Sequence, residues 1–224
     1  MKKHILCFGD SNTHGYCADP ADCADGGIRF NESERWAMRL QQALGEEYLV
    51  TEAGLSGRTT CFEDPLHEGM SGLSYITPCL KSHEFIDLLI IMLGTNDTKD
   101  RFGASAACIA LGMARLVRKA MDTDCWGGKA PKVLVIAPPP IGDGMFQSPV
   151  GPTMGAGCAE KSRQLPQYYK EQCDLLGVDF LDAGALGCEF NQVDYMHLTK
   201  KGHATLANAL AARIPEILKA ASGR

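Results

Sequence analysis

The stretch Ile5-Leu6-Cys7-Phe8-Gly9-Asp10-Ser11-Asn12-Thr13 decides how this chain is organised. Four apolar residues lead directly into a polar Gly-Asp-Ser-Asn segment, which predicts a buried strand that ends at a tight turn. In a parallel sheet, functional side chains gather beyond the carboxyl ends of the strands. A serine at such a turn, taken alone, most often only caps the next helix. A larger role for Ser11 requires partners from elsewhere in the chain.

The composition excludes several classes of protein. The 224 residues are 45% hydrophobic and 22% charged, and we expect one globular domain over residues 1–224. The net charge of -5, without any run of Lys or Arg, argues against binding to nucleic acid. No apolar stretch reaches the roughly 20 residues of a membrane span, so we expect no membrane partner.

The ten cysteines are spread along the chain and include no C-x-x-C pair. The apolar run after the two N-terminal lysines is too short for a secretory signal, so we expect buried thiols in a reducing cytoplasm rather than disulfides. Because H-E-x-x-H is also absent, we expect neither a metal nor a cofactor.

Strand-like and helix-like segments alternate along the chain. Apolar runs predict strands at residues 4–8, 48–53, 86–93, 132–137 and 178–181. Apolar residues at helical spacing predict helices at residues 33–44, 104–121, 159–176 and 199–221. This alternation predicts an α/β fold: a three-layer α/β/α, flavodoxin-like domain with a mostly parallel five-stranded sheet. The segments 16–30 and 141–157 fit neither pattern, and such long loops are often functional or form subunit contacts.

Polar turns follow three of the predicted strands, and a fourth polar segment precedes the last helix. These turns are residues 9–12, 54–59, 94–97 and 194–197, which we expect to meet at one edge of the sheet. A serine nucleophile needs an imidazole base, and the base needs a carboxylate that orients it. Ser11, His197 and Asp194 supply these three groups.

Acyl transfer also needs hydrogen-bond donors for the oxyanion of the tetrahedral intermediate. The backbone N–H groups of Ser11 and Gly54 and the side-chain amide of Asn96 are candidates for this oxyanion hole. The carboxylates of Asp10 and Asp97 lie beside candidate residues, and we expect both to accept hydrogen bonds from loop N–H groups.

The blocks Gly-Asp-Ser-Asn, Ala-Gly-Leu-Ser-Gly, Gly-Thr-Asn-Asp and Asp-x-x-His resemble, in order and spacing, the four blocks of the SGNH (GDSL-type) hydrolases. The resemblance implies that Ser11 is the nucleophile, His197 the base and Asp194 the acid of a catalytic triad. It also implies that Gly54 and Asn96 are oxyanion donors.

Residues 52–60 and 91–99 look more like the bacterial arylesterases and acyltransferases of that family. This similarity implies a homo-oligomeric enzyme that hydrolyses short-chain or aryl esters through an acyl-enzyme on Ser11. Acyl transfer to alcohols is a further implied activity. The loops 16–30 and 141–157 are expected to close the site from neighbouring subunits.

Five residues near the blocks are candidates for substrate binding because of their position in the sequence. They are Asn12, Tyr16, Lys99, Phe102 and Phe146. One position departs from the broader family pattern, which often has Asn where this chain has Glu52. A buried carboxylate needs a partner, so we expect Glu52 to pair with Arg58 or with another buried donor.

A second Asp-x-x-His sequence competes with the one near the C-terminus. Asp64 and His67 have the same spacing but lie in a polar loop, so we expect His197 to be the base.

A carbohydrate O-acetyl esterase is the alternative within the family. A flavodoxin-like binding module is disfavoured because no phosphate-binding glycine motif follows a strand, and a catalytically silent relative is disfavoured because all five catalytic residue types are present. An α/β-hydrolase would show G-x-S-x-G, which is absent.

Overall fold

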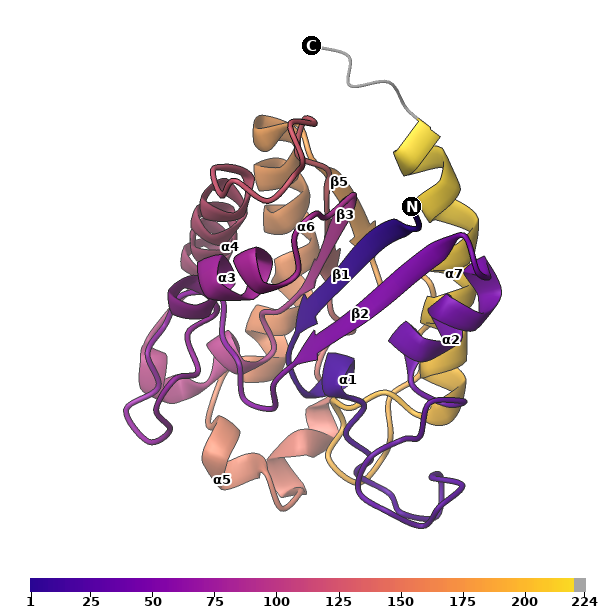
Figure 1. Ribbon diagram of the computed structural model, residues 1–224. Helices are drawn as coiled ribbons and strands as arrows, with labels where there is room; N and C mark the ends of the chain where they lie inside the picture. The colour runs from indigo at the N-terminus through magenta and orange to yellow at the C-terminus, as the bar shows by residue number, and fades with distance from the viewer. Residues whose placement is uncertain (220–224) are drawn as a thin grey trace.

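The five apolar runs form a parallel sheet in the computed structural model, which describes residues 1–219 (Figure 1). The strand order is β2-β1-β3-β4-β5, and all pairs are parallel. The strands are β1 (Lys3–Gly9), β2 (Tyr48–Gly54), β3 (Leu88–Met92), β4 (Val133–Ala137) and β5 (Asp179–Asp182). The predicted three-layer α/β fold is confirmed.

Helices cover both faces of this sheet (Figure 1). One face is covered by α3 (Gly72–Ser82), α4 (Ala106–Met121) and α6 (Cys158–Leu176). The other face is covered by α2 (Trp36–Leu44) and α7 (Lys200–Lys219). Two short helices, α1 (Ser11–His14) and α5 (Gly151–Met154), lie near the carboxyl ends of the strands. The last two residues of the helix predicted at 199–221 lie outside the described part of the chain.

Alternation along β1 explains how one strand supports two cores. Leu6 and Phe8 pack with α3 and α4, whereas Ile5 and Cys7 pack with α2 and α7. Successive side chains of a strand point to opposite faces, and here both faces are apolar because both are covered. A strand buried on both sides is held rigidly, so the turn that follows it has a fixed position.

The helix α3 was not expected from the sequence. This helix contains Pro78, and it starts at Gly72, so its composition does not predict a helix. The Ser71 hydroxyl accepts a hydrogen bond from the Ser74 N–H at the start of the helix, and Ile76 and Leu80 are completely buried. Capping and burial therefore outweigh the local preference of these residues.

The two segments without a clear pattern acquire small structures of their own. Residues 16–30 fold back through a bridge between Tyr16 and Arg29. Residues 141–157 contain a 3-10 helix (Asp143–Gln147) and α5, and they form a separate apolar cluster that includes Met145 and Met196. This second segment is thereby packed against the loop that carries His197.

The strand order reverses between β1 and β3, because the chain continues outward to β2 on one side and to β4 on the other. In open α/β sheets, such a reversal leaves a crevice at the carboxyl ends of the strands. Ser11 follows β1 directly, and Asn96 lies in the turn after β3. None of the helices within residues 1–219 combines the length and the apolar character that crossing a membrane requires.

Candidate active site

The turn after β1 presents Ser11 at the first position of α1. Asp10 caps this helix by accepting a hydrogen bond from the Asn12 N–H at 3.0 Å, and Gly15, with a φ of 85°, ends it. Gly54 of the neighbouring strand packs directly under α1, where a Cβ would collide with the backbone of His14. Glycine is required there because the two backbones approach so closely.

Ser11, His197 and Asp194 form a continuous hydrogen-bonded chain. The Ser11 Oγ lies 2.7 Å from His197 Nε2, and His197 Nδ1 lies 2.6 Å from Asp194 Oδ2. An ionised Asp194 accepts a hydrogen bond from the Nδ1–H of His197, and this tautomer leaves Nε2 unprotonated and able to accept the hydroxyl proton of Ser11. The structure therefore brings together three residues that are up to 186 positions apart in the sequence.

The Asp194 carboxylate is held in its ionised form. Burial alone would raise its pKa, but the hydrogen bond and charge of His197 and the N–H groups of His197 and Met196 lower the pKa to about 2. The other oxygen, Oδ1, also accepts a hydrogen bond from Asn191 Nδ2 at 2.9 Å. Asp194 is thus an anion at neutral pH.

Asn96, one of the oxyanion donors expected from the sequence, is buried beside the Asp10 carboxylate that caps α1. Asn96 begins the 3-10 helix after β3, and its Nδ2 donates to the Arg58 carbonyl at 3.1 Å. The contact of Nδ2 with Asp10 Oδ2, at 3.5 Å, is at the limit for a hydrogen bond. The Asn96 amide is therefore oriented mainly by the Arg58 carbonyl, from the turn that follows Gly54.

Two buried carboxylates support these turns. Asp10 caps α1, and Asp97 Oδ1 accepts a hydrogen bond from the Thr60 N–H at 2.8 Å, so both accept from loop N–H groups as expected. Burial raises the pKa of Asp10 to about 6, although the Asn12 N–H opposes the shift. Burial likewise raises the pKa of Asp97 to about 6 against its bonds from Thr60.

The expected partner of Glu52 requires a correction. Arg35 donates two hydrogen bonds to the Glu52 carboxylate, at 2.7 and 2.9 Å. Arg58 instead donates to the carbonyls of Gly9, at 2.9 Å, and Ala53, and its guanidinium stacks on the Phe8 ring at 4.1 Å. The pairing with Arg58 is wrong because the Arg58 side chain turns inward to satisfy strand-end carbonyls.

The second Asp-x-x-His sequence forms no dyad. The Asp64 carboxylate is fully buried and lies 3.5 Å from Lys99 Nζ and 3.3 Å from Arg101 Nε. The His67 side chain is exposed, and its backbone N–H donates to the Asp64 carbonyl at 3.2 Å. Asp64 therefore joins the loop 61–72 to the segment that follows Asn96.

The five candidates for substrate binding have very different surroundings. The Tyr16 ring lies 4.6 Å from the His197 ring, and Phe146 is 45% exposed. Phe102 packs against Phe62 at 5.5 Å. Lys99, only 5% exposed, pairs with Asp64. Asn12 is 1% exposed and bonds to the backbone near His197. Of these five side chains, that of Tyr16 is the one whose ring packs against the ring of His197.

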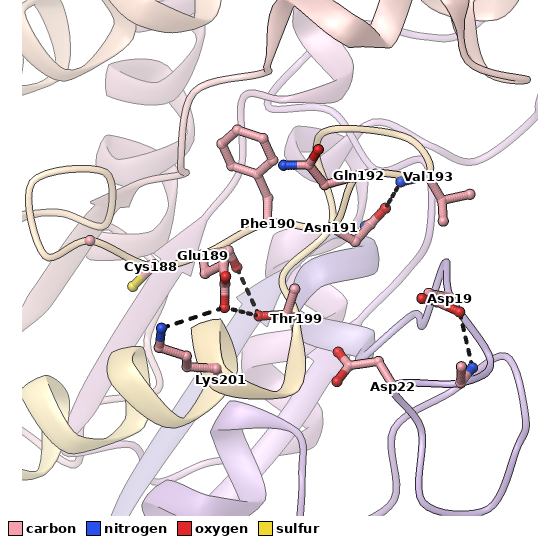
Figure 2. A pocket seen from close by; sticks show the side chains of 12 residues that line it. Asp19, Asp22, Cys188, Glu189, Phe190, Asn191, Gln192, Val193, Thr199 and Lys201 are labelled. Atoms are coloured by element: carbon pink, nitrogen blue, oxygen red, sulfur yellow. Dashed lines mark hydrogen bonds and ion pairs between the residues drawn. The ribbon is translucent and has the colours of Figure 1, made fainter.

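A groove of about 880 Å³ adjoins the His197 loop (Figure 2). It runs between the 16–30 segment, which contributes Asp19 and Asp22, and the 187–201 segment. Lys201 and Thr199 both contact the Glu189 carboxylate on its wall. None of the site residues expected from the sequence lines this groove. Within residues 1–219, no group of three or more His, Cys, Asp or Glu side chains is arranged to hold a metal ion.

Asn191, which was not expected from the sequence, supports the triad aspartate. Its Oδ1 accepts hydrogen bonds from the N–H groups of Val193 and Asp194, and its Nδ2 donates to Asp194 and to the His197 carbonyl. An Asn three residues before the acid is typical of a side chain that organises a turn. The three-residue spacing between Asn191 and Asp194 is the signal in the sequence from which the role of Asn191 could have been predicted.

Comparison with known proteins agrees with this geometry. The model of the GDSL-like lipase/acylhydrolase family matches residues 7–205. The structure of the native aryl esterase of M. smegmatis is 38% identical, with a TM-score of 0.86, over 96% of this chain and 99% of that chain. A carbohydrate acetylesterase from Sinorhizobium meliloti is 36% identical, with a TM-score of 0.83, over 96% of this chain and 100% of that chain. The search of curated protein sequences returned no match. The chain belongs to the GDSL-like lipase/acylhydrolase family, whose SGNH-type members include both of these esterases.

Proposed function

We propose that this carboxylic ester hydrolase acts through an acyl-enzyme on Ser11. The main support is the hydrogen-bonded chain from Ser11 through His197 to Asp194. The Ser11 Oγ lies 2.7 Å from His197 Nε2, and His197 Nδ1 lies 2.6 Å from Asp194 Oδ2. His197 takes the hydroxyl proton as Ser11 attacks the ester carbonyl, and the Asp194 anion stabilises the imidazolium that forms.

The tetrahedral intermediate needs donors aimed at its oxyanion. We assign this role to the N–H groups of Ser11 and Gly54 and to the Asn96 amide. Gly54 packs against α1, which carries Ser11, and the Asn96 Nδ2 lies 3.5 Å from the carboxylate of Asp10, the residue before Ser11. Loss of one such donor costs about 10²–10³ in rate. His197 then protonates the leaving alcohol, and water resolves the acyl-enzyme by the same base catalysis.

Hydrolysis of p-nitrophenyl acetate tests this proposal. The wild type should show turnover with a burst of p-nitrophenol, and Ser11→Ala should lower kcat by at least about 10³-fold. Ser82→Ala, an exposed substitution on α3, is the matched control and should leave kcat unchanged. Equal turnover by Ser11→Ala and wild type would refute the mechanism.

We also propose that short-chain and aryl esters are the preferred substrates. The support is the similarity to the aryl esterase of M. smegmatis at 38% identity. A panel of esters, varied separately in acyl chain and in alcohol, maps both limits. Adding a primary alcohol and measuring the new ester tests acyl transfer, which would replace water in the second step.

Deacetylation of carbohydrates is the second candidate function. It is favoured by the similarity to the carbohydrate acetylesterase from Sinorhizobium meliloti, which is almost as strong as that to the aryl esterase. Faster release of acetate from acetylated xylo-oligosaccharides than from aryl acetates would support it. The reverse order would favour the aryl esters.

The oligomeric state and the location of the protein are two further proposals. We propose a homo-oligomer whose segments 16–30 and 141–157 lie at subunit contacts. The exposed side chains of Ile28 and Phe146 support this proposal, and light scattering tests it.

We propose a cytoplasmic location on the support of ten free cysteines, eight of them buried. Fractionation of expressing cells tests the location.

A further inference from the structure

Asn12 follows the nucleophile directly, and its side chain reaches the loop that carries the base. Its Nδ2 donates to the Met196 carbonyl at 3.3 Å, and its Oδ1 accepts from the Leu198 N–H at 2.9 Å. These two backbone groups flank His197 on either side. The single Asn12 amide is therefore hydrogen-bonded to the backbone both before and after His197.

Within residues 1–219, three hydrogen bonds join the α1 segment to residues 191–198. One is the bond between Ser11 and His197, and the other two are those of Asn12. The remaining bonds to the His197 backbone come from Asn191 and Asp194 of the same loop. Those bonds shape the loop, but they do not fix its position relative to Ser11.

The backbone of this loop is strained at Tyr195. Its φ of 62° lies in the left-handed region, the single such value among the non-glycine residues described. A conformation of this kind costs about 1–3 kcal/mol and persists only where surrounding contacts determine it. The bond from Asn12 to the Met196 carbonyl lies one residue away and is one such contact.

The chemistry of the contact requires an amide. The Met196 carbonyl needs a donor and the Leu198 N–H needs an acceptor, and an asparagine side chain offers one of each. A leucine has a similar shape but would leave both backbone groups buried without partners, since this position is 1% exposed. Both polar atoms of the Asn12 amide are thus engaged by the backbone of the His197 loop.

We propose that Asn12 is a positioning residue, which holds the His197 imidazole in line with the Ser11 hydroxyl. The inference rests on the proposed function, because it concerns proton transfer between these two side chains. We call the two hydrogen bonds that link Asn12 to the Met196 carbonyl and the Leu198 N–H the Asn12 clamp. The proton transfer occurs in both acylation and deacylation, so the clamp acts on both steps. A displacement of about 1 Å at a reacting group can cost 10²-fold in rate.

The first measurement compares Asn12→Leu with wild type on p-nitrophenyl acetate. The kcat per active site, counted from the burst amplitude, should fall about 10- to 100-fold while KM changes less than about twofold. Labelling of Ser11 by a fluorophosphonate should slow in parallel. Thr13→Val, also completely buried in α1, is the matched control and should keep both rates. If Asn12→Leu folds poorly, Asn12→Ser, which cannot span both backbone groups, should show the same split.

A double-mutant cycle separates positioning from a general role in the fold. In a His197→Ala background the clamp has nothing to position, so adding Asn12→Leu should change the residual rate by less than about twofold. A full additional loss there would overturn the proposal, as would an unchanged kcat for Asn12→Leu alone. Ser11→Ala and His197→Ala are measured in parallel. If those two retain activity, the proposed mechanism fails; if they lose it and Asn12→Leu does not, only the clamp fails.

Discussion

The chain contains the pattern Asp-x-x-His twice, and the aspartate has different partners in the two copies. In the copy near the C-terminus, His197 Nδ1 lies 2.6 Å from the Asp194 carboxylate. In the other copy, the Asp64 carboxylate pairs with Lys99 and Arg101, and the His67 side chain is exposed. The same residue types at the same spacing thus form a dyad in one loop and an ion-pair junction in the other.

The difference comes from what surrounds each carboxylate. Asp194 accepts bonds from two backbone N–H groups and from Asn191, so its second oxygen is aimed at His197. The surroundings of Asp64 are cationic, and a buried carboxylate beside two cations pairs with them first. Position in the fold, rather than the pattern, decides which histidine pairs with its aspartate.

The largest expected effect separates the two histidines. His197→Ala should lower kcat for p-nitrophenyl acetate by at least about 10³-fold, because no other imidazole lies within reach of Ser11 in the described structure. His67→Ala should leave kcat within about twofold, because its side chain lies at the surface. A large loss in His67→Ala would break the comparison.

The two aspartates should differ in the kind of loss. Asp194→Asn should lower kcat by about 10²–10⁴-fold, because the amide no longer fixes the Nδ1–H tautomer. Asp64→Asn should instead destabilise the fold by about 3–5 kcal/mol, because it leaves the buried charge of Lys99 unpaired. Thermal melts and kcat per folded molecule measure both variants. A normal melting temperature for Asp64→Asn would show that the ion pairs contribute little.

The contact between Ser11, His197 and Asp194 could be expected from the sequence because the candidate residues lie in short polar blocks, three of which follow predicted strands. Ser11, Gly54 and Asn96 each follow an apolar run, so the fold class also predicts where they meet. Side-chain direction was harder to predict. Glu52 was expected to pair with Arg58 or with another buried donor. The carbonyls at the strand ends bind Arg58, and Arg35 is the donor to Glu52. The helix α3 was missed because burial in the core overrides its glycine and proline.

Asp97 extends the comparison to a completely buried carboxylate whose hydrogen-bond donors are the N–H and the hydroxyl of Thr60. Its pKa is raised to about 6, chiefly by burial, whereas that of Asp194 is lowered to about 2. From pH 4 to pH 6 the unfolded state therefore loses the Asp97 proton before the native state does. The contribution of Asp97 to stability is complete below pH 4 and is lost as the pH rises through 6.

Asp97→Asn should remove this dependence, since the amide oxygen can still accept the bonds from Thr60. Between pH 4 and pH 7 the variant should gain up to about 3 kcal/mol relative to wild type. Urea unfolding at both values measures the gain, and Asp124→Asn, at an exposed position, is the control. Parallel pH profiles for Asp97→Asn and wild type would contradict the assignment.

The smallest effect concerns the residue three positions before each aspartate. Asn191 donates to Asp194 Oδ1 at 2.9 Å and to the His197 carbonyl at 2.8 Å, whereas the corresponding position before Asp64 is Cys61. Asn191→Ala should lower kcat about 10-fold, because one bond to a charged group is worth about 1.5 kcal/mol. Cys61→Ala should leave kcat unchanged. An unchanged kcat for Asn191→Ala would mean that the N–H groups of Met196 and His197 alone orient Asp194. The contrast between the two copies would then depend on the cations beside Asp64 and not on Asn191.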